Sequence, residues 1–322
     1  MKTLYLDCSM GAAGDMLTAA LLELIPDQDE FIAELNALGI PGVHVKKEES
    51  VKCGITGTHI TVTVHGEEEE SVDVHHHHHD HDHEHHHDHE HSHDHGHHHH
   101  SGLHDIEHIV RGHLNLPEKV QDDIMAVYML IAEAESKAHG KPVTEVHFHE
   151  VGTMDAFTDI TAVCMLMNKI APDQMIVSPV HVGSGQVKCA HGILPVPAAA
   201  TAHILRDVPM YGGHIRGELC TPTGAALLKH FATRFGDMPV MTTKAIGYGM
   251  GKKDFEAANC VRVLLGETAD KGDTVAELSC NVDDMTAEAI RYLIIISSTA
   301  ALIVIAAVIY IITKSKYKKE FL

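Results

Sequence analysis

Two imidazoles and two carboxylates lie within the short segment His147–Asp155, whose sequence is HFHEVGTMD. His147 and His149 are two residues apart, so on an extended chain both side chains lie on one face. Imidazole and carboxylate are common ligands of divalent transition metals. We therefore predict a metal site formed by His147, His149, Glu150 and Asp155. The alternative is a core histidine followed by carboxylates that cap a helix.

A second concentration of metal-binding side chains lies between His75 and His100. In this tract 18 of the 32 histidines occupy 26 positions and alternate with aspartate and glutamate. Neutral imidazole binds transition metals at neutral pH, and a tract of this composition cannot build a packed core. We predict a disordered insertion that holds several ions loosely, with a solvated low-complexity linker as the alternative.

Two glycine-containing turns each precede an apolar run typical of a helix. The first turn contains Gly11 and Gly14, and the second contains Thr221, Thr223 and Gly224. Glycine allows close approach of a ligand, and the N–H groups at a helix start can face an anion. We predict that these five residues bind the anionic part of a cofactor or substrate. Plain helix capping is the alternative for both turns.

Two residues are candidates for catalytic proton transfer. Asp7 follows a short apolar strand, and His191 lies beside Gly192 in a loop. A carboxylate or an imidazole can serve as a general base when it faces the reacting atom. The choice between these two residues is left undecided, because a lone loop histidine is often incidental and an aspartate can simply cap a turn.

The composition restricts the class of partner. The formal net charge is −21, and Cys53–Val110 contains 13 acidic residues and no lysine or arginine. An acidic balance disfavours nucleic acid, whose phosphates need cationic side chains, and favours cations. The seven cysteines are widely spaced and form no C-x-x-C pair, which indicates a reducing, cytoplasmic location.

The residues of the N-terminal half need a frame of strands and helices. Alternating and periodic apolar residues predict strands at Thr3–Leu6, Val43–Glu48 and Ile55–Val64, and helices at Met16–Leu24, Glu30–Leu38, Asp105–Leu114 and Glu118–His139. Pro117 and Gly140 flank the last of these helices, as is typical of helix boundaries.

The C-terminal half continues in the same manner. Helices are predicted at Asp159–Lys169, Ala198–Leu205 and Leu219–Lys229, and strands at Val177–Gly185 (ending in a glycine turn), Cys260–Leu265 and Val275–Cys280. We expect an ordered loop at Cys189–Pro197 and a mobile glycine turn at Ala245–Lys253. Because strands and helices alternate only in part, the fold class is α/β or α+β, with mixed sheets and flanking helices.

The predicted domain organisation has four parts. Residues 1–72 form an N-terminal α/β segment, 73–102 the insertion, 103–290 the main α+β domain packed with 1–72, and 291–322 an apolar helix with a basic tail. The 21 uncharged residues 293–313 meet the length of about 20 that a transmembrane helix requires. A single-span anchor and a truncated, frameshifted or wrongly joined tail both explain this run.

Several blocks together resemble the nickel-insertion (LarC) family of lactate racemase maturation. They are DCSMGAAGDM from Asp7, HFHEVGTMD from His147, HGILPVP from His191, TPTGA from Thr221, GYGMG from Gly247 and NVDDM from Asn281. The blocks follow the family's order through nearly all of residues 1–290, and an internal histidine-rich segment is also similar to the family. The sequence departs from the family after Arg291, where the family continues into a further domain.

The resemblance implies a cyclometallase of the lyase type, which inserts Ni(II) into pyridinium-3,5-bisthiocarboxylic acid mononucleotide. The product is the nickel-pincer cofactor, with two Ni–S bonds and one Ni–C bond. The resemblance also implies use of CTP with Mn or Mg, through a domain that is not recognisable here. The implied partners are nickel, the mononucleotide substrate, and either a separate chain carrying the C-terminal domain or a nickel-pincer enzyme; homo-oligomerisation is left open. The alternative is a nickel store or metallochaperone without catalytic activity.

Overall fold

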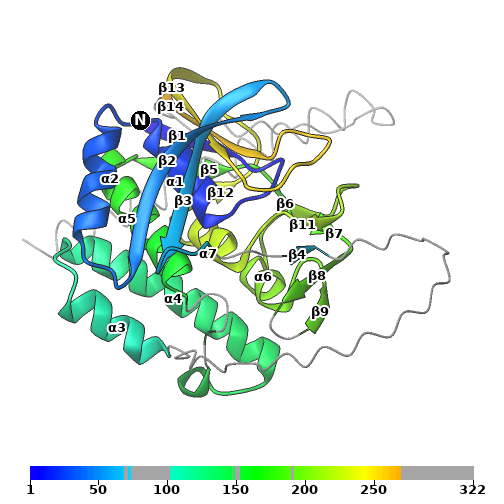
Figure 1. Ribbon diagram of the computed structural model, residues 1–322. Helices are drawn as coiled ribbons and strands as arrows, with labels where there is room; N and C mark the ends of the chain where they lie inside the picture. Colours follow the sequence, from blue (N-terminus) through cyan, green and yellow to red (C-terminus); the bar gives the residue numbers. More distant parts are fainter. Residues whose placement is uncertain (69–71, 74–101, 147, 149–152, 190–191, 270–322) are drawn as a thin grey trace, which may run out of the picture. The chain divides into compact units, whose positions relative to one another are not determined.

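The computed structural model describes residues 1–68, 72–73, 102–146, 148, 153–189 and 192–269 (Figure 1). The helices are α1 (Gly14–Leu22), α2 (Gln28–Ala37), α3 (Leu103–Gly112), α4 (Glu118–His139), η1 (Val143–Glu145), α5 (Met154–Ile170), α6 (Ala199–Ile204) and α7 (Pro222–Phe231). The strands are β1 (Lys2–Asp7), β2 (Val43–Lys52), β3 (Ile55–Val64), β4 (Val72–Asp73), β5 (Gln174–Val177), β6 (Val180–His181), β7 (Gly183–Ser184), β8 (Gln186–Cys189), β9 (Gly192–Pro195), β10 (Met210–Tyr211), β11 (Gly217–Glu218), β12 (Arg234–Phe235), β13 (Met241–Met250) and β14 (Cys260–Thr268).

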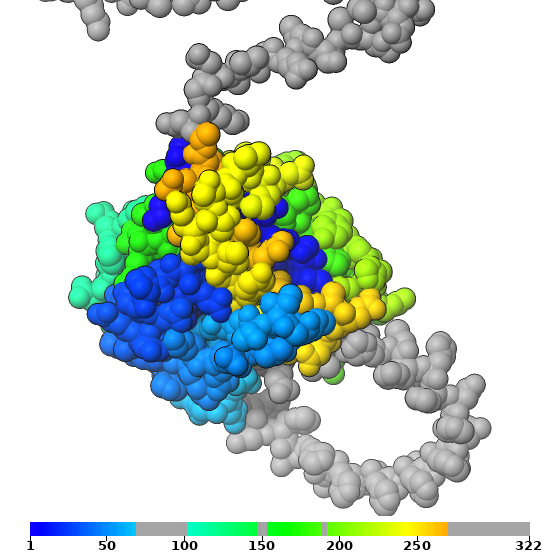
Figure 2. Space-filling view, turned by 90° about the horizontal axis from the view of Figure 1, so that it is seen from above, coloured from blue at the N-terminus to red at the C-terminus, as the bar shows by residue number. Residues whose placement is uncertain are grey.

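A seven-stranded mixed sheet with the order β12-β5-β1-β14-β13-β3-β2 forms the frame. β1 is parallel to β5 and antiparallel to β14, so the first and last described strands lie next to each other. Figure 2 shows the same proximity, with N-terminal residues in blue beside yellow and orange residues from the end of the described chain. A mixed sheet with flanking helices agrees with the predicted fold class.

The core lies between the sheet and its helices. Leu4 and Leu6 of β1 are buried in the main core with helices α1, α4, α5 and α7, whereas Tyr5 joins a smaller cluster with Ile176 and Leu264. This alternation follows from the strand geometry, in which successive side chains point to opposite faces. The helix-facing side of the sheet therefore carries most of the buried apolar surface.

Several predicted elements coincide with observed ones. The helix Glu118–His139 and the strand Ile55–Val64 have the predicted bounds. Gly140 adopts the left-handed conformation (φ 63°) that commonly ends a helix. Helix α5 begins at Met154, five residues before the predicted start, because Thr153 acts as its N-cap and accepts a hydrogen bond from the Ala156 amide (3.4 Å).

The prediction of a mobile glycine turn at Ala245–Lys253 was wrong for most of that range. Residues up to Met250 belong to strand β13, which pairs with β14 along its length. A Cβ atom added to Gly249 would lie 1.8 Å from the Met16 carbonyl oxygen, and one added to Gly247 would lie 2.1 Å from that of Ala20. The glycines are therefore needed for close packing of helix α1 on the strand, and not for a flexible turn.

The segment predicted as an ordered loop at Cys189–Pro197 contains strand β9, which pairs with β8 in an antiparallel hairpin. The periodic pattern was too short to reveal it, since each strand has four residues. The predicted strand Val177–Gly185 is likewise divided among β5, β6 and β7. Pro179 interrupts it, because proline has no N–H for a continuous ladder.

The histidine-rich tract separates two elements of one folded unit. β4 pairs with β8 before the tract, and α3 packs on α4 after it. Met1–Asp270 forms one compact unit, and residues 271–322 lie outside the described residues. The predicted disorder of the tract, the strand Val275–Cys280 and the apolar helix 293–313 also lie outside them. No helix within the described residues is long and apolar enough to cross a membrane.

Candidate functional site

The two predicted anion-binding turns lie against each other. The Ala12 amide donates to the Leu219 carbonyl (3.0 Å), and the Thr221 amide donates to the Ala12 carbonyl (3.1 Å). A Cβ atom on Gly11 would lie 1.9 Å from the Leu219 oxygen, and one on Gly224 would lie 2.2 Å from the Ala12 oxygen. Both glycines therefore permit close approach between two segments of backbone.

Capping, the alternative left open by the sequence, describes the second turn. Thr221 is the N-cap of α7, and its Oγ1 accepts a hydrogen bond from the Gly224 amide (3.1 Å). Thr223 is buried, with 6% of its surface exposed. In the first turn the Gly11 amide donates to the Cys8 carbonyl (3.0 Å). Several of the N–H groups predicted to face an anion are thus paired inside the protein.

Asp7, a candidate for proton transfer, forms an ion pair. Its Oδ2 accepts a hydrogen bond from Arg262 Nη2 (2.6 Å), and its Oδ1 accepts one from the Ser9 amide (3.1 Å). Arginine stays charged in proteins, so this contact is a charge-assisted hydrogen bond. Both carboxylate oxygens of Asp7 are therefore already engaged within the protein.

Another aspartate, Asp159 of helix α5, lies against the start of helix α1. A Cβ atom added to Gly14, the first residue of α1, would lie 2.6 Å from both Cβ and Oδ2 of Asp159. Asp159 is only 7% exposed, and among the described residues its Oδ1 has no hydrogen-bond partner. Gly14 is therefore required for the approach of a carboxylate from within the protein, and one oxygen of that carboxylate is buried without a hydrogen-bond partner among the described residues.

The electrostatic surroundings of Asp159 favour its protonated form. Burial raises the pKa of Asp159 well above its usual range, and the negative charges of Asp155 and Asp15 raise it further, while Lys252 and the Asp15 amide oppose the shift. Burial also raises the pKa of Asp15, against hydrogen bonding from the Met16 amide and the charges of His59 and Lys252. Asp15, Asp155 and Asp159 thus form a carboxylate cluster at the facing starts of α1 and α5.

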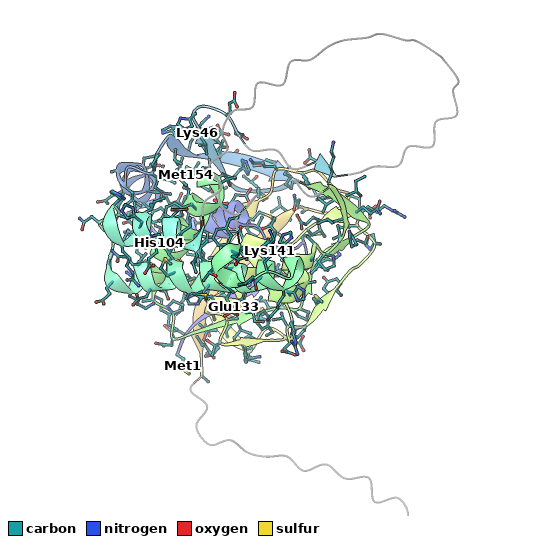
Figure 3. The ribbon with its side chains drawn as sticks, turned by 90° about the horizontal axis from the view of Figure 1, so that it is seen from below. Met1, Lys46, His104, Glu133, Lys141 and Met154 are labelled. Carbon is teal, nitrogen blue, oxygen red and sulfur yellow. The ribbon has the colours of Figure 1, made fainter. Side chains whose placement is uncertain are left out.

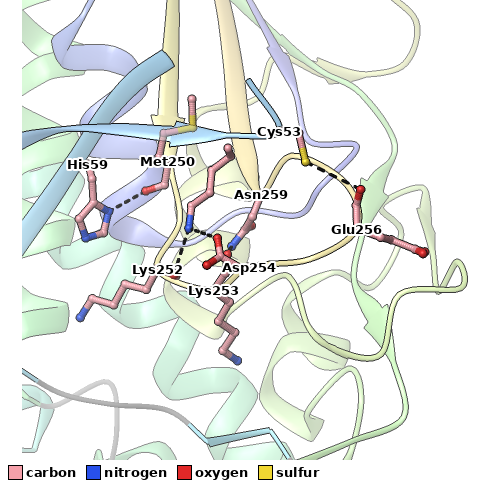
Figure 4. Close-up of polar contacts among 9 residues, drawn as sticks. Cys53, His59, Met250, Lys252, Lys253, Asp254, Glu256 and Asn259 are labelled. Carbon is pink, nitrogen blue, oxygen red and sulfur yellow. Dashed lines mark hydrogen bonds and ion pairs between the residues drawn. The ribbon is translucent and has the colours of Figure 1, made fainter. Parts of the chain in front are cut away.

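His59 and Lys252, which Figure 4 labels, bring an imidazole and a cation near Asp15 of this cluster. His59 Nδ1 lies 2.8 Å from the Met250 carbonyl oxygen. Since a carbonyl can only accept, Nδ1 donates this hydrogen bond. Lys252 Nζ also lies 3.5 Å from Glu68 Oε2.

The loop after β13 is held in place by further hydrogen bonds. Lys52 Nζ donates to Asp254 Oδ1 (2.6 Å) and to the Lys252 carbonyl (3.2 Å), and Asn259 Nδ2 donates to the Lys253 carbonyl (2.9 Å). Figure 4 shows these contacts around the labelled residues. They position the backbone that carries Lys252 near the carboxylate cluster.

Of the four predicted metal ligands, the structure describes only Asp155, in the first turn of α5. His147, His149, Glu150 and the candidate base His191 lie outside the described residues. Phe148, between the two histidines, is buried and its ring centroid is 5.6 Å from that of Tyr128. Within the described ranges, no group of three or more His, Cys, Asp or Glu side chains is arranged to hold a metal ion.

The thiols of the core are poor candidates for chemistry. Cys8, Cys164 and Cys220 are buried, and burial raises the pKa of each thiol. A thiol with a raised pKa is a weak nucleophile and a weak metal ligand at neutral pH, since the thiolate is the reactive form. Cys8, Cys53, Cys164, Cys220 and Cys260 are free thiols.

Sequence reasoning missed the grouping at the carboxylate cluster. Asp15, His59, Asp159 and Lys252 were not among the predicted site residues. The one available signal was the GYGMG block, whose glycines bring strand β13 against the backbone of α1.

Comparison with known proteins places the chain in a family. The family model described as "Nickel insertion protein" matches residues 4–313. The chain belongs to the nickel insertion protein family. The match extends past Arg291, where the sequence alone indicated a departure from the family, and it spans both turns, the carboxylate cluster and the histidine-rich tract.

Individual relatives agree with this assignment. The pyridinium-3,5-bisthiocarboxylic acid mononucleotide nickel insertion protein of Clostridium kluyveri is 40% identical over 300 residues, covering 91% of this chain and 69% of the relative. Proteins of the same name from Desulfitobacterium hafniense (35% identity, 91% and 67% coverage) and Staphylococcus saprophyticus (36% identity, 90% and 67% coverage) are also similar. No solved structure matches the chain.

Proposed function

We propose that this nickel insertion protein inserts Ni(II) into pyridinium-3,5-bisthiocarboxylic acid mononucleotide to form the nickel-pincer cofactor. The observation that carries the proposal is the 40% identity to a protein of that name across 91% of this chain. The reaction belongs to the lyase type of metal insertion. Nickel and the mononucleotide are its substrates.

The chemistry requires an acceptor for one ring proton. Ni(II) binds the two thiocarboxylate sulfurs, and a Ni–C bond forms with the electron pair of the C–H bond between them. The carbon loses H⁺, and nickel keeps its oxidation state, so no oxidant or reductant is needed. A carboxylate whose pKa is raised towards neutral pH is a better general base for this step. Proton transfer is most efficient when the pKa of the base lies near the working pH.

We assign the proton acceptor to the carboxylate cluster, with Asp159 as the acceptor and Asp15 as its neighbour. Burial and like charge raise the pKa of Asp159, and its Oδ1 has no partner among the described residues. Asp7 is less suitable because Arg262 already pairs with it. His191, the other predicted candidate, keeps that status as a prediction.

The nickel ligands remain those proposed from the sequence: His147, His149, Glu150 and Asp155. The contribution of the described structure is the place of Asp155, whose negative charge acts on Asp159. A metal ion held at Asp155 would therefore be near the proposed proton acceptor. A divalent cation there would also stabilise the ionised form of the cluster.

CTP with Mn or Mg, which the resemblance implies, does not fit the described turns. A triphosphate cradle needs unpaired N–H groups, and those of Gly11, Ala12 and Gly224 are hydrogen-bonded inside the protein. No step of the proposed reaction is assigned to a nucleotide within the described residues. A partner chain carrying a C-terminal domain is the proposed source of any nucleotide dependence.

The test is nickel insertion by the purified chain, with and without residues 291–322. Each form is incubated with Ni(II) and the mononucleotide precursor, with and without CTP, and the product is detected by mass spectrometry. The expected product has gained one nickel and lost protons. If both forms bind nickel stoichiometrically but neither forms a Ni–C bond under any condition, the enzyme proposal is wrong and the storage or metallochaperone alternative replaces it.

A further inference from the structure

Helix α3, which follows the histidine-rich tract, presents histidines on its exposed face. Ile106 and Val110 are fully buried in the main core, whereas His104, Glu107 and His108 are exposed. On a helix of 3.6 residues per turn, residues three and four apart are neighbours on one face. His104 and His108 are therefore adjacent on the surface, and Glu107 lies beside them. Figure 3 labels His104.

The spacing of this pair suits a divalent transition metal. Two imidazoles at i and i+4 on a helix can bind one ion, as they do in helical metal-binding motifs. The His113 ring centroid is 4.9 Å from that of His108, so a third imidazole is close. The carboxylate of Glu107 adds negative charge that favours a cation over an anion at this face.

The helix that carries the pair is held firmly. At its start the Gly102 amide donates to Asp105 Oδ2 (2.9 Å), which caps the turn containing His104. Near its end Arg111 Nη2 donates to Asp122 Oδ1 of α4 (2.6 Å). The two imidazoles are thus displayed from an ordered support, which reduces the conformational entropy lost when a metal ion binds both.

The start of helix α3 lies near Val146. A Cβ atom added to Gly102 would lie 4.0 Å from the carbonyl oxygen of Val146, the residue that directly precedes His147. His104 is two residues from Gly102. In the other direction along the chain, His100 of the tract is also two residues from Gly102.

We propose that His104 and His108, the α3 histidine pair, form a nickel-binding site that passes nickel from the tract to the insertion site. The relay role rests on the proposed function, whereas nickel binding by the pair does not. The structure describes no group of three or more side chains arranged as metal ligands. The pair therefore supplies two ligands, and water supplies the others. Two protein ligands hold nickel less tightly than a closed site, which suits transfer.

Hydrogen exchange of the full chain at pH 8, with and without NiCl₂, tests binding separately from catalysis. A metal bound across one helical turn stabilises that turn against opening by the linkage factor 1 + [Ni]/Kd. At free nickel ten times the Kd of the pair, the amides of α3 should exchange about tenfold more slowly. The double variant His104→Gln/His108→Gln should lose this protection, although its tract still binds nickel.

The matched control is His44→Gln/His203→Gln, which removes two exposed histidines from other elements. It should keep the full protection of α3. Protection of α3 that persists in the His104→Gln/His108→Gln variant, or that is absent from the wild-type chain, would overturn the proposal. Thermal unfolding without nickel checks that both double variants fold, since all four histidines are exposed.

The relay is tested by nickel insertion in single-turnover reactions, with nickel supplied only as ion preloaded on the chain. His104→Gln/His108→Gln should slow product formation several-fold, and excess free nickel should restore the rate. An unchanged rate with preloaded nickel would overturn the relay. If wild-type protein forms no product, the proposed function fails, yet the exchange experiment still decides whether the pair binds nickel.

Discussion

Asp159→Asn tests the buried carboxyl at the centre of the proposed site. The substitution keeps the size and shape of the side chain and removes its ionisation. Burial and the charges of Asp155 and Asp15 raise the pKa of Asp159 in the folded protein, whereas an unfolded aspartate has a pKa of about 3.9. The folded and the unfolded protein therefore bind different numbers of protons at pH values between these two pKa values.

The sign of the pH dependence follows from this difference. Between the unfolded and the folded pKa, the folded state holds a proton that the unfolded state has released. The free energy of unfolding therefore falls as the pH rises through this interval, by up to about 1.4 kcal/mol per pH unit for one proton. Below the pKa that Asp159 has in the unfolded state, its contribution to the free energy of unfolding is fully present. This contribution is lost as the pH rises through the pKa that Asp159 has in the folded state.

Urea unfolding at a series of pH values from 4 to 8 measures the effect. The free energy of unfolding of Asp159→Asn relative to wild type should increase with pH, with a slope of up to about 1.4 kcal/mol per unit. Asp237→Asn, which removes an exposed carboxyl, is the matched control. A difference between Asp159→Asn and wild type that does not change with pH would refute the electrostatic account of the cluster.

The same variant should lose activity while it gains stability at neutral pH. A general base typically contributes about 10²–10⁴-fold to a rate, so Asp159→Asn should slow nickel insertion by at least about 100-fold. Insertion activity that stays near the wild-type rate would remove Asp159 from the mechanism without affecting the stability argument. The two measurements therefore separate the chemical role from the electrostatic one.

Three further predictions concern neighbouring residues. Gly249→Ala should lower the free energy of unfolding by about 3 kcal/mol, because the new methyl group meets the backbone of α1. Gly112→Ala should change it little, because a methyl group there enters open space. Urea unfolding measures both variants. Thr221→Ala should cost about 1 kcal/mol through loss of the α7 cap, and Thr221→Ser should restore it in the same assay. Asp7→Asn should slow nickel insertion much less than Asp159→Asn in a single-turnover assay, and an equal loss would favour Asp7 as the base.

Local patterns in the sequence were sufficient to predict many of the helices and strands. The helix Glu118–His139 was predictable because Pro117 and Gly140 mark its ends and the apolar residues between them have helical spacing. The strand Ile55–Val64 was predictable because its side chains alternate between two faces. Both signals lie within the element itself, so no knowledge of distant residues was needed.

The role of the glycines could be decided only from the tertiary structure. The sequence predicted that Gly11 and Gly224 let an anionic ligand approach closely, and it placed Gly249 in a mobile turn. In the folded protein it is backbone in all three cases: the carbonyls of Leu219, Ala12 and Met16. A pattern of glycines carries no information about which group will fill the space.

By itself the sequence determined the metal-binding residue types, the order of the motifs and hence the family. Only the tertiary structure brought Asp159, Asp15, His59 and Lys252 together, from α5, α1, β3 and the loop after β13. These residues are far apart in the chain, and burial raises the pKa of the two aspartates. The reason is physical, since the pKa of a carboxyl depends on the solvent it loses and the charges it meets, and both are set by packing.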